Sequence, residues 1–236
     1  MYQTVHYRDA DGDWATPATT LDVMNAVVPP VRQRDAERTR AELLEVAGRV
    51  FAEDGYSGAR VDDIAEQTRT TKRMIYYYFG GKEQLYLAVL ENAYLGIRKA
   101  EQALRVDDLD PIVAVRRLAE LTYDHHVSHP DFIRLVLIEN IHQGEFIKRL
   151  DSLRTTATPA LGVLDEVLDR GRAAGEFRDD VDALDVHLVI SAYCVFQVTN
   201  RHTFGFLFGR DLSAPEHRDH LRSMIGDVVA GWLTAR

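Results

Sequence analysis

Basic and tyrosine side chains are concentrated in residues 69–82, which read RTTKRMIYYYFGGK and contain no acid. The four bases are Arg69, Lys72, Arg73 and Lys82. Lysine and arginine neutralise phosphates or reach the edges of guanine bases. A tyrosine hydroxyl can donate a hydrogen bond to a phosphate while its ring lies against a sugar. These residue types, at this spacing, predict a surface that binds a polyanion.

The positive charge of this stretch contrasts with the rest of the chain. The 236 residues contain 37 acids against 28 lysines and arginines, a net charge of −9. Residues 1–31 sum to −3, residues 32–82 to +1 from ten bases and nine acids, and residues 83–236 to −7. The only segment that is not acidic contains the basic stretch. The position of these bases on the surface, and not the net charge of the chain, therefore indicates what kind of molecule the protein binds.

Composition limits the class of protein. The hydrophobic content of 46% and the charged content of 28% are typical of a globular chain that is long enough for one or two domains. Cys194 is the only cysteine, so an intrachain disulfide and a thiolate metal cluster are excluded. No apolar run reaches the roughly 18 residues of a membrane span, and the N-terminus lacks the pattern of a signal peptide. We expect a cytoplasmic protein with no membrane partner.

Apolar residues recur at spacings of three and four from Arg32 onward, which is typical of amphipathic helices. No segment alternates like a strand, so we expect an all-α fold with about nine helices. Gly55 and Gly80-Gly81 end helices, and Asp110-Pro111 begins one. The expected helices cover residues 35–53, a short stretch around 61–65, 71–79, 82–105, 110–128, 131–142, part of 145–173, 179–204 and 215–234.

The two short helices before residue 80 would form a helix-turn-helix motif packed on the first helix. In such motifs the second short helix enters the major groove of DNA. Lys72, Arg73 and Tyr76 would share about one turn of it, and Tyr77 would continue that surface. The alternative is that the aromatic residues 76–79 are all core. Four consecutive helical residues step about 100° apiece, so they cannot all face one core.

A family resemblance supports this interpretation. Residues 41–91 resemble the DNA-binding domain of the TetR/AcrR family of bacterial transcriptional regulators. The resemblance implies a ligand-responsive dimer, more often a repressor, that leaves a palindromic DNA operator when a small-molecule effector binds. The matching positions are Phe51, Gly55, Tyr56, Val61, Ile64, Ala65, Tyr76, Tyr77, Phe79, Lys82, Glu83 and Leu85. With the basic stretch, it predicts DNA contacts from Arg60, Thr70, Thr71, Lys72, Arg73, Tyr76, Tyr77 and Lys82.

The chain departs from the family pattern at three places. Residues 68–70 read Thr-Arg-Thr where the family usually has Ala-Gly-Val. We therefore expect Arg69 to occupy a backbone conformation that suits glycine, in an altered or less stable turn. Ala59 replaces a frequent threonine, and Arg60 could compensate for its hydroxyl. Lys72, Arg73 and Met74 stand where small residues are common, which affects base preference.

The second half of the chain resembles the family less specifically. HPDFIRLVLIENIHQG and GRAAGEFRDDVDALDVHLVISAYCVFQVTNRHTFGFLFGRDL are similar to the C-terminal domain of a subgroup that includes repressors of nicotinate degradation. That similarity implies a homodimer and a small catabolic or aromatic effector. The predicted effector-binding residues are Tyr123, His126, Glu139, Tyr193, Phe196, Gln197 and Asn200.

The physical case for an effector pocket comes from polar residues on apolar helix faces. Gln197 and Asn200 end such a stripe, and His126 lies on another. Glu139 also lies on an apolar stripe, where a carboxylate needs a partner. Arg116, Arg117 or an effector could supply that partner. The alternative is that these side chains belong to a satisfied core or to a dimer interface.

The last helix has an apolar face that nothing downstream covers. Paired with the helix over 179–204, it would form a four-helix seam across a two-fold axis. We therefore expect Ile225 and Trp232 at or near that seam. The alternative is packing inside one subunit.

Two other classes of function stay open from the residues alone, a helical enzyme and a helical adaptor that binds protein. No nucleophile turn accompanies Asp124, His125 and Ser128, and residues 80–82 lack the other residues of a phosphate-binding loop. The pairs His125/His129 and His217/His220 have metal-ligand spacing but no accompanying glutamate. We predict no enzyme activity, no cofactor and no metal.

The expected organisation has three parts. Residues 1–31 are predicted to form a disordered N-terminal arm. Residues 32–82 would form the helix-turn-helix DNA-binding domain, and residues 83–236 the effector-binding and dimerisation domain.

Overall fold

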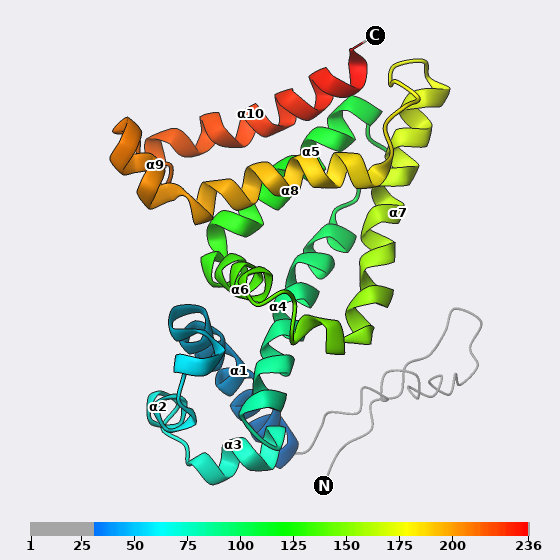
Figure 1. Cartoon of the computed structure of the whole chain (residues 1–236). Coiled ribbons are helices and arrows are strands. Elements are labelled where there is room, and N and C mark those ends of the chain that lie inside the picture. Colours follow the sequence, from blue (N-terminus) through cyan, green and yellow to red (C-terminus); the bar gives the residue numbers. More distant parts are fainter. Residues whose placement is uncertain (1–30, 236) are drawn as a thin grey trace, which may run out of the picture. The chain divides into compact units, whose positions relative to one another are not determined.

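The computed structural model describes residues 31–235, without the side chains of residues 31–34, 102 and 154–160. Apart from Val31, which begins the first helix, the predicted N-terminal arm lies outside the described residues. Between Val31 and Ala235 the chain forms ten α-helices and one short 3-10 helix, with no strand (Figure 1). This confirms the all-α prediction. None of these helices is long and apolar enough to cross a lipid bilayer.

The helices follow one another with short connections. Their bounds are α1 Val31–Gly58, α2 Val61–Gln67, α3 Lys72–Phe79, α4 Lys82–Ala103, α5 Pro111–Ser128, α6 Pro130–Ile141, the 3-10 helix η1 Ile147–Arg149, α7 Asp151–Ala173, α8 Ala183–Thr199, α9 Arg201–Phe208 and α10 Pro215–Thr234. Local signals explain several ends. The Asp110 carboxylate accepts hydrogen bonds from the first turn of α5, and Gly80 ends α3 in the left-handed conformation.

The single helix expected over 179–204 is two helices. It begins later, at Ala183, where Asp182 and Asp185 form a capping box. It is then interrupted at Asn200, whose φ of −104° and ψ of 1° leave the helical region. The backbone N–H of Phe204 and the hydroxyl of Thr203 then donate to the Asn200 carbonyl and begin α9. This break accounts for the tenth α-helix.

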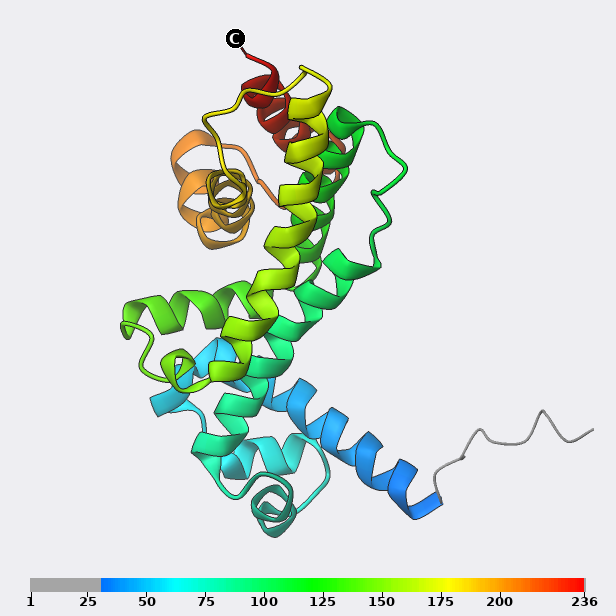
Figure 2. The ribbon, with the colours of Figure 1, turned by 90° about the vertical axis from the view of Figure 1, so that its right-hand side faces the viewer.

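From Thr39 onward the chain forms one compact unit that contains two large apolar clusters. One cluster joins the buried faces of α1, α2, α3 and the first half of α4, and it also includes Leu135 of α6 and Phe146 before η1. The other joins α5, α7, α8 and α10. Helix α4 contributes to the first cluster and continues beyond it, with α7 alongside in both views (Figures 1 and 2).

Ile225 cannot itself contact a partner at a two-fold seam, so only the expectation that it lies near such a seam stays a prediction. Ile225 is fully buried within its own subunit, in the cluster that also contains buried residues of α5. Trp232 is partly buried against the same cluster. Helix α5 covers this face of α10, and ion pairs from Arg222 to Glu120 and Asp124 join the two helices. The apolar stripe of the last helix is therefore largely used inside one subunit.

Candidate nucleic-acid interface and effector cavity

The turn between α2 and α3 is held by hydrogen bonds around an unusual residue. Arg69 has a φ of 51°, in the left-handed region that favours glycine, as its position predicted. The Thr68 hydroxyl donates to the carbonyl oxygens of Ile64 and Ala65, at 2.8 and 3.2 Å. The backbone N–H of Thr70 also donates to the Ala65 carbonyl, at 3.0 Å. These bonds stabilise the turn in which the arginine lies.

Helix α3 buries one face and exposes the other. Thr71 caps its N-terminus, because its hydroxyl oxygen accepts a hydrogen bond from the Met74 N–H. Ile75 and Phe79 are buried, whereas Tyr77 is 78% exposed. The alternative in which residues 76–79 are all core therefore fails for Tyr77. The exposed face offers two tyrosine hydroxyls, those of Tyr76 and Tyr77, beside cationic side chains.

The cations of this face differ in their partners. Arg73 is exposed and has no ion-pair or hydrogen-bond partner among the side chains described. Lys72 lies 3.1 Å from the carboxylate of Asp62 on α2, so its charge is not unopposed, contrary to expectation. The Lys82 ammonium lies 4.8 Å from the centre of the Tyr56 ring and donates to the Ser57 carbonyl at 3.5 Å.

Of the remaining predicted DNA contacts, Arg60 is exposed and Thr70 is half-buried. Arg60 immediately precedes α2 and makes no side-chain cap there. The predicted DNA-contacting residues therefore all belong to α3, the first residue of α4 and the connections on either side of α2.

A small cavity of about 170 Å³ lies among α4, α5, α6 and α8. Its lining is apolar at Tyr94, Ile97, Phe132, Ile133, Val136 and Val195, and polar at Arg98, Glu101, Thr122, His126, His187 and Ser191. A cavity of about 150 Å³ in another protein is known to hold benzene. The volume therefore suits a molecule with one ring.

The polar groups of the cavity include one ion pair. The Arg98 guanidinium donates to a Glu101 carboxylate oxygen at 2.6 Å, and both side chains are mostly buried. Burial lowers the pKa of His126 to about 4, with a smaller effect from His125, and it also lowers the pKa of His187. Both histidines that line the cavity are therefore neutral at neutral pH, and the ion pair supplies its charges.

Only one predicted effector residue, His126, lines this cavity. Tyr123 is buried in the neighbouring apolar cluster, where its ring centre lies 6.5 Å from that of Tyr193. The Tyr193 hydroxyl donates to the backbone carbonyl of Leu221 at 2.8 Å, which holds α8 to α10. The structure thus places both tyrosines in the packing between helices.

Three more predicted residues lie toward the end of α8. Phe196 is 40% exposed and packs edge-on against Phe204, with ring centres 5.8 Å apart. Asn200 ends the helix, and its side-chain amide donates to the Thr199 hydroxyl. Gln197 is buried, and its side-chain oxygen finds no donor among the described residues. None of the three lines the cavity.

Glu139 has partners other than those expected. One carboxylate oxygen accepts from the Tyr86 hydroxyl at 2.9 Å. The other accepts from the backbone N–H groups of Phe146 and Ile147, at 3.1 and 2.9 Å. Arg116, one expected partner, instead pairs with Asp227. The carboxylate is satisfied inside the protein, so it ties α6 to α4 and to η1.

Residues that the sequence analysis missed supply most of the polar lining. Arg98 and Glu101 lie on α4, and His187 and Ser191 lie one turn apart on α8, with the Ser191 hydroxyl 3.3 Å from His187 Nε2. A usable signal was present on α4, where Glu101 follows Tyr94 and Ile97 on one face at helical spacing.

The histidines considered as metal ligands stack on each other. The ring centres of His125 and His129 lie 4.2 Å apart, and His129 Nδ1 lies 2.9 Å from the His125 carbonyl. Within the described part of the chain, no group of three or more histidine, cysteine, aspartate or glutamate residues could hold a metal ion.

The buried histidine predicts a pH dependence of stability. The pKa of His126 is about 4 in the folded chain and near 6.5 when unfolded, so the unfolded state binds more protons as pH falls from 6.5 toward 4. We expect the free energy of unfolding to be about 2 kcal/mol lower at pH 5 than at pH 7.5 from this residue. Urea denaturation of His126→Gln should show a smaller pH dependence than the parent.

The exposed His142 is the control for this measurement. His142→Gln should leave the pH dependence as it is in the parent. Equal pH dependence in His126→Gln and His142→Gln would show that His126 is not held neutral by burial.

The chain has a helix-turn-helix whose second helix exposes basic and tyrosine side chains, and α4 joins it to a helical region with a cavity. This architecture is typical of a DNA-binding regulator with a sensor domain. A family model for "Bacterial regulatory proteins, tetR family" matches residues 43–89, and one for "Tetracyclin repressor-like, C-terminal domain" matches residues 111–229. The chain belongs to the TetR family of DNA-binding transcriptional regulators, which confirms the resemblance.

Individual relatives agree with this membership. The chain is 37% identical to the HTH-type transcriptional repressor NicS of Pseudomonas putida over 199 residues, which cover 84% of this chain and 94% of that protein. It is also 37% identical to the HTH-type transcriptional repressor SCO4008 of Streptomyces coelicolor, over 47% of this chain and 54% of that protein. The TetR family regulator PfmR of Thermus thermophilus shares the fold, with a TM-score of 0.60 at 23% identity over 80% of this chain and 97% of that one.

Proposed function

We propose that the protein is a homodimeric cytoplasmic repressor that leaves its palindromic operator when a one-ring effector enters the cavity. Residues 32–82 bind DNA, and residues 83–236 bind the effector and dimerise. The exposed face of α3 is the observation that carries the first half of this proposal. The similarity to NicS, a repressor, supports the direction of regulation. The protein catalyses no reaction in this proposal.

Helix α3 reads the DNA bases. Arg73 lies in its first turn, exposed and without an ion-pair partner in the described chain. In helix-turn-helix proteins the first residues of the recognition helix reach the base edges. Tyr76 and Tyr77 extend the surface toward the phosphates, and the N-terminal ends of α3 and α4 add the positive ends of two helix dipoles.

The first prediction concerns the two cations at the start of α3. Arg73→Ala should weaken operator binding by about 1–3 kcal/mol, because a bidentate contact to a base edge is lost. Lys72→Ala should have a smaller effect, since the lysine must first leave Asp62. Fluorescence anisotropy with an operator selected from random DNA would measure both, at several salt concentrations.

Arg105→Ala is the matched control, because Arg105 is exposed beyond the far end of α4. It should bind operator like the parent. Unchanged binding by Arg73→Ala would place the reading surface elsewhere. A partner that stays bound as salt rises would favour the protein adaptor, because phosphate binding must weaken through counterion release.

The dimer forms through the outer face of α8. Leu184 and Leu188 are 61% and 66% exposed, and Phe196 continues the same stripe two turns on. Val228 of α10 is also exposed, and α10 packs beside α8 (Figure 1). Exposed apolar side chains along one helix face are typical of an interface. Two copies of this face would form the seam, in place of the buried face of α10.

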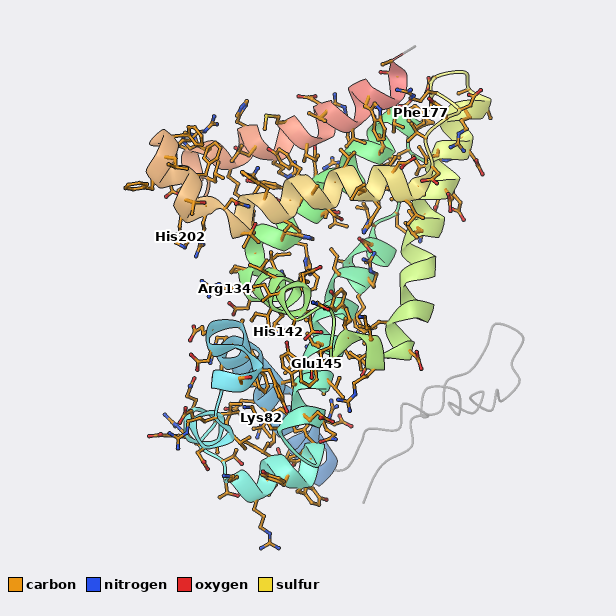
Figure 3. All side chains as sticks on the ribbon, in the orientation of Figure 1. Lys82, Arg134, His142, Glu145, Phe177 and His202 are labelled. Carbon is orange, nitrogen blue, oxygen red and sulfur yellow. The ribbon has the colours of Figure 1, made fainter. Side chains whose placement is uncertain are left out.

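The switch between cavity and DNA passes through α6. This helix supplies three side chains of the cavity wall, and Glu139 on the same helix holds Tyr86 of α4. Beyond α6, the left-handed residues Gln143 and Gly144 reverse the chain so that the Phe146 N–H reaches Glu139. In Figure 3, His142 and Glu145 mark this connection, and Lys82 marks the start of α4.

Phe146 then joins the core of the DNA-binding part. Its ring centre lies 4.4 Å from that of Tyr56 and 5.0 Å from that of Tyr86. Arg149 follows and pairs with Glu83 at 2.6 Å. An effector that displaces α6 would therefore move Phe146 and the helix-turn-helix together. A shift of a few ångströms is enough to change the spacing of two recognition helices, which must match successive major grooves.

The test of this function has two steps. Operator DNA is selected from a random library with the full-length protein, and the complex is then titrated with one-ring aromatic compounds. Selection of a palindrome and its release by one of these compounds are the expected results. Failure to enrich any DNA sequence would contradict the proposal.

A further inference from the structure

Arg98 has unused hydrogen-bonding capacity at the wall of the small cavity. One terminal nitrogen donates to Glu101. No other hydrogen bond of the Arg98 guanidinium joins it to the described side chains or backbone. A guanidinium presents five N–H donors in a planar fork, and it binds a carboxylate best through two parallel hydrogen bonds. A bidentate position is therefore available on this side chain.

The rest of the cavity matches a flat ring attached to such a carboxylate. Tyr94, Phe132 and Val195 supply aromatic and apolar wall, from α4, α6 and α8 respectively. His126 and the His187–Ser191 pair supply neutral donors or acceptors for a polar ring atom or substituent. The volume of about 170 Å³ suits a single ring.

We propose that the cavity binds a single-ring aromatic monocarboxylate through Arg98, and that Glu101 takes up a proton as this anion binds. The inference rests on the proposed function, because it specifies the effector class for the same cavity. It adds a chemical event, proton uptake, that the proposed function does not require.

Proton uptake follows from the geometry of the ion pair. Glu101 already lies 2.6 Å from the Arg98 guanidinium. A ligand carboxylate on the same guanidinium creates two like charges within a few ångströms, and in a dry site such a pair holds one proton. A ligand carboxylate that lies beside Glu101 therefore favours the neutral form of one of the two carboxyl groups.

The other titratable groups around the ion pair are competing sites for this proton, because an entering anion also favours the charged form of a neutral histidine; the Glu101→Gln variant separates them from Glu101. Helix α4 adds Tyr94, whose pKa burial raises to about 12. Helix α5 adds His126 and helix α8 adds His187, and burial lowers the pKa of both. Helix α6 contributes only apolar side chains to the wall. Burial raises the pKa of Glu101 against the opposing effect of Arg98, which favours this residue as the site of protonation.

The sign of the pH dependence is fixed by this uptake. A ligand that brings one proton with it binds more tightly as pH falls, by at most about tenfold per pH unit. The trend should hold between pH 8 and pH 6. Throughout that window the free ligand stays ionised, since aromatic carboxylic acids titrate at lower pH.

Calorimetric titration of the full-length protein with benzoate tests the proposal, with benzamide as the neutral analogue of the same shape. Benzoate should bind at least about tenfold more tightly than benzamide. Repeating the titration at pH 7 in buffers of different ionisation enthalpy should give an uptake of close to one proton for each benzoate bound. Neither effect is expected if the ring alone is recognised.

Variants on α4 provide the second readout. Arg98→Leu should remove the preference for benzoate over benzamide. Glu101→Gln should bind benzoate more tightly than the parent and without proton uptake, because glutamine cannot titrate. Lys99→Leu removes the same charge from an exposed position one residue along the helix, so it should behave like the parent.

Several results would overturn the inference. They are equal binding of benzoate and benzamide, unchanged benzoate binding in Arg98→Leu, an absence of proton uptake in the parent, or no binding of benzoate at all. Operator binding measured on the same samples distinguishes a failure of the proposed function from a failure of this inference about the effector. A protein that binds operator and is released only by an uncharged compound would keep its proposed function and refute this inference.

Discussion

Replacing Leu188 with aspartate should convert the protein to monomers and weaken operator binding at least about a hundredfold. Leu188 is 66% exposed at the centre of the apolar stripe on α8. In the dimer it would be covered, so a carboxylate there must lose its hydration without a partner. A monomer contacts only one half-site of the operator. In the dimer, binding of the second half-site is intramolecular, and the monomer loses that gain in affinity.

Sedimentation equilibrium and operator anisotropy would measure the two effects of Leu188→Asp. Ile141→Asp is the control, because Ile141 is also 66% exposed but ends α6, outside the stripe. That variant should stay dimeric. Ile225→Asp should instead lose helical circular dichroism, because Ile225 is fully buried in its own subunit. A dimeric Leu188→Asp variant would move the interface to another face.

Removing the Glu139 carboxylate should lower the free energy of unfolding by about 3–5 kcal/mol. Glu139→Ala would leave the Tyr86 hydroxyl and the N–H groups of Phe146 and Ile147 without their acceptor. The Tyr86 hydroxyl and the Phe146 N–H are buried, so water does not replace the carboxylate. Glutamine keeps one acceptor oxygen, and we expect Glu139→Gln to lose much less.

Denaturant unfolding of the single and double variants would isolate the contact. Tyr86→Phe removes the stranded hydroxyl, so its effect in the Glu139→Ala background should be clearly smaller than in the parent. Glu145→Ala is the control, an exposed glutamate on the same connection. Additive effects of the Tyr86 and Glu139 changes would mean that this hydrogen bond does not couple α6 to α4.

The same variants test how the effector signal travels. If α6 carries the signal, Glu139→Gln and Phe146→Ala should bind operator but release it poorly at saturating effector. A variant that binds effector normally and still releases DNA like the parent would assign transmission to α4 alone. The coupling must also be reciprocal, so operator should weaken effector binding by the same factor in the parent.

Local patterns in the sequence were sufficient for the fold class and the DNA-reading helix. Glycine at residues 80 and 81, the Asp110-Pro111 cap and the three-to-four spacing of apolar residues act within a few residues of chain, so they can be recognised without tertiary information. The unusual backbone of Arg69 was expected from the family resemblance, which places glycine at that position of the turn. The family motif depends on the same short spacings.

The effector cavity could not be located in the same way. Its walls come from four helices, and one-dimensional periodicity shows that a face is apolar without showing which helix covers it. Tyr193 and Glu139 have the sequence pattern of pocket residues. In the fold, however, the Tyr193 hydroxyl donates to the Leu221 carbonyl, and Glu139 accepts from the Tyr86 hydroxyl. Arg98 looks like an ordinary surface cation of a helix until its neighbours are known.

The sequence by itself thus determined that the chain is helical, that it contains a helix-turn-helix and that α3 exposes cations and tyrosines. These properties follow from interactions between residues close in the chain. Tertiary structure decided that Ile225 is core, that Lys72 meets Asp62 and that Arg98 and Glu101 line a cavity. Those pairings depend on which helices pack together, because burial and the solvation of charge are properties of the assembled fold.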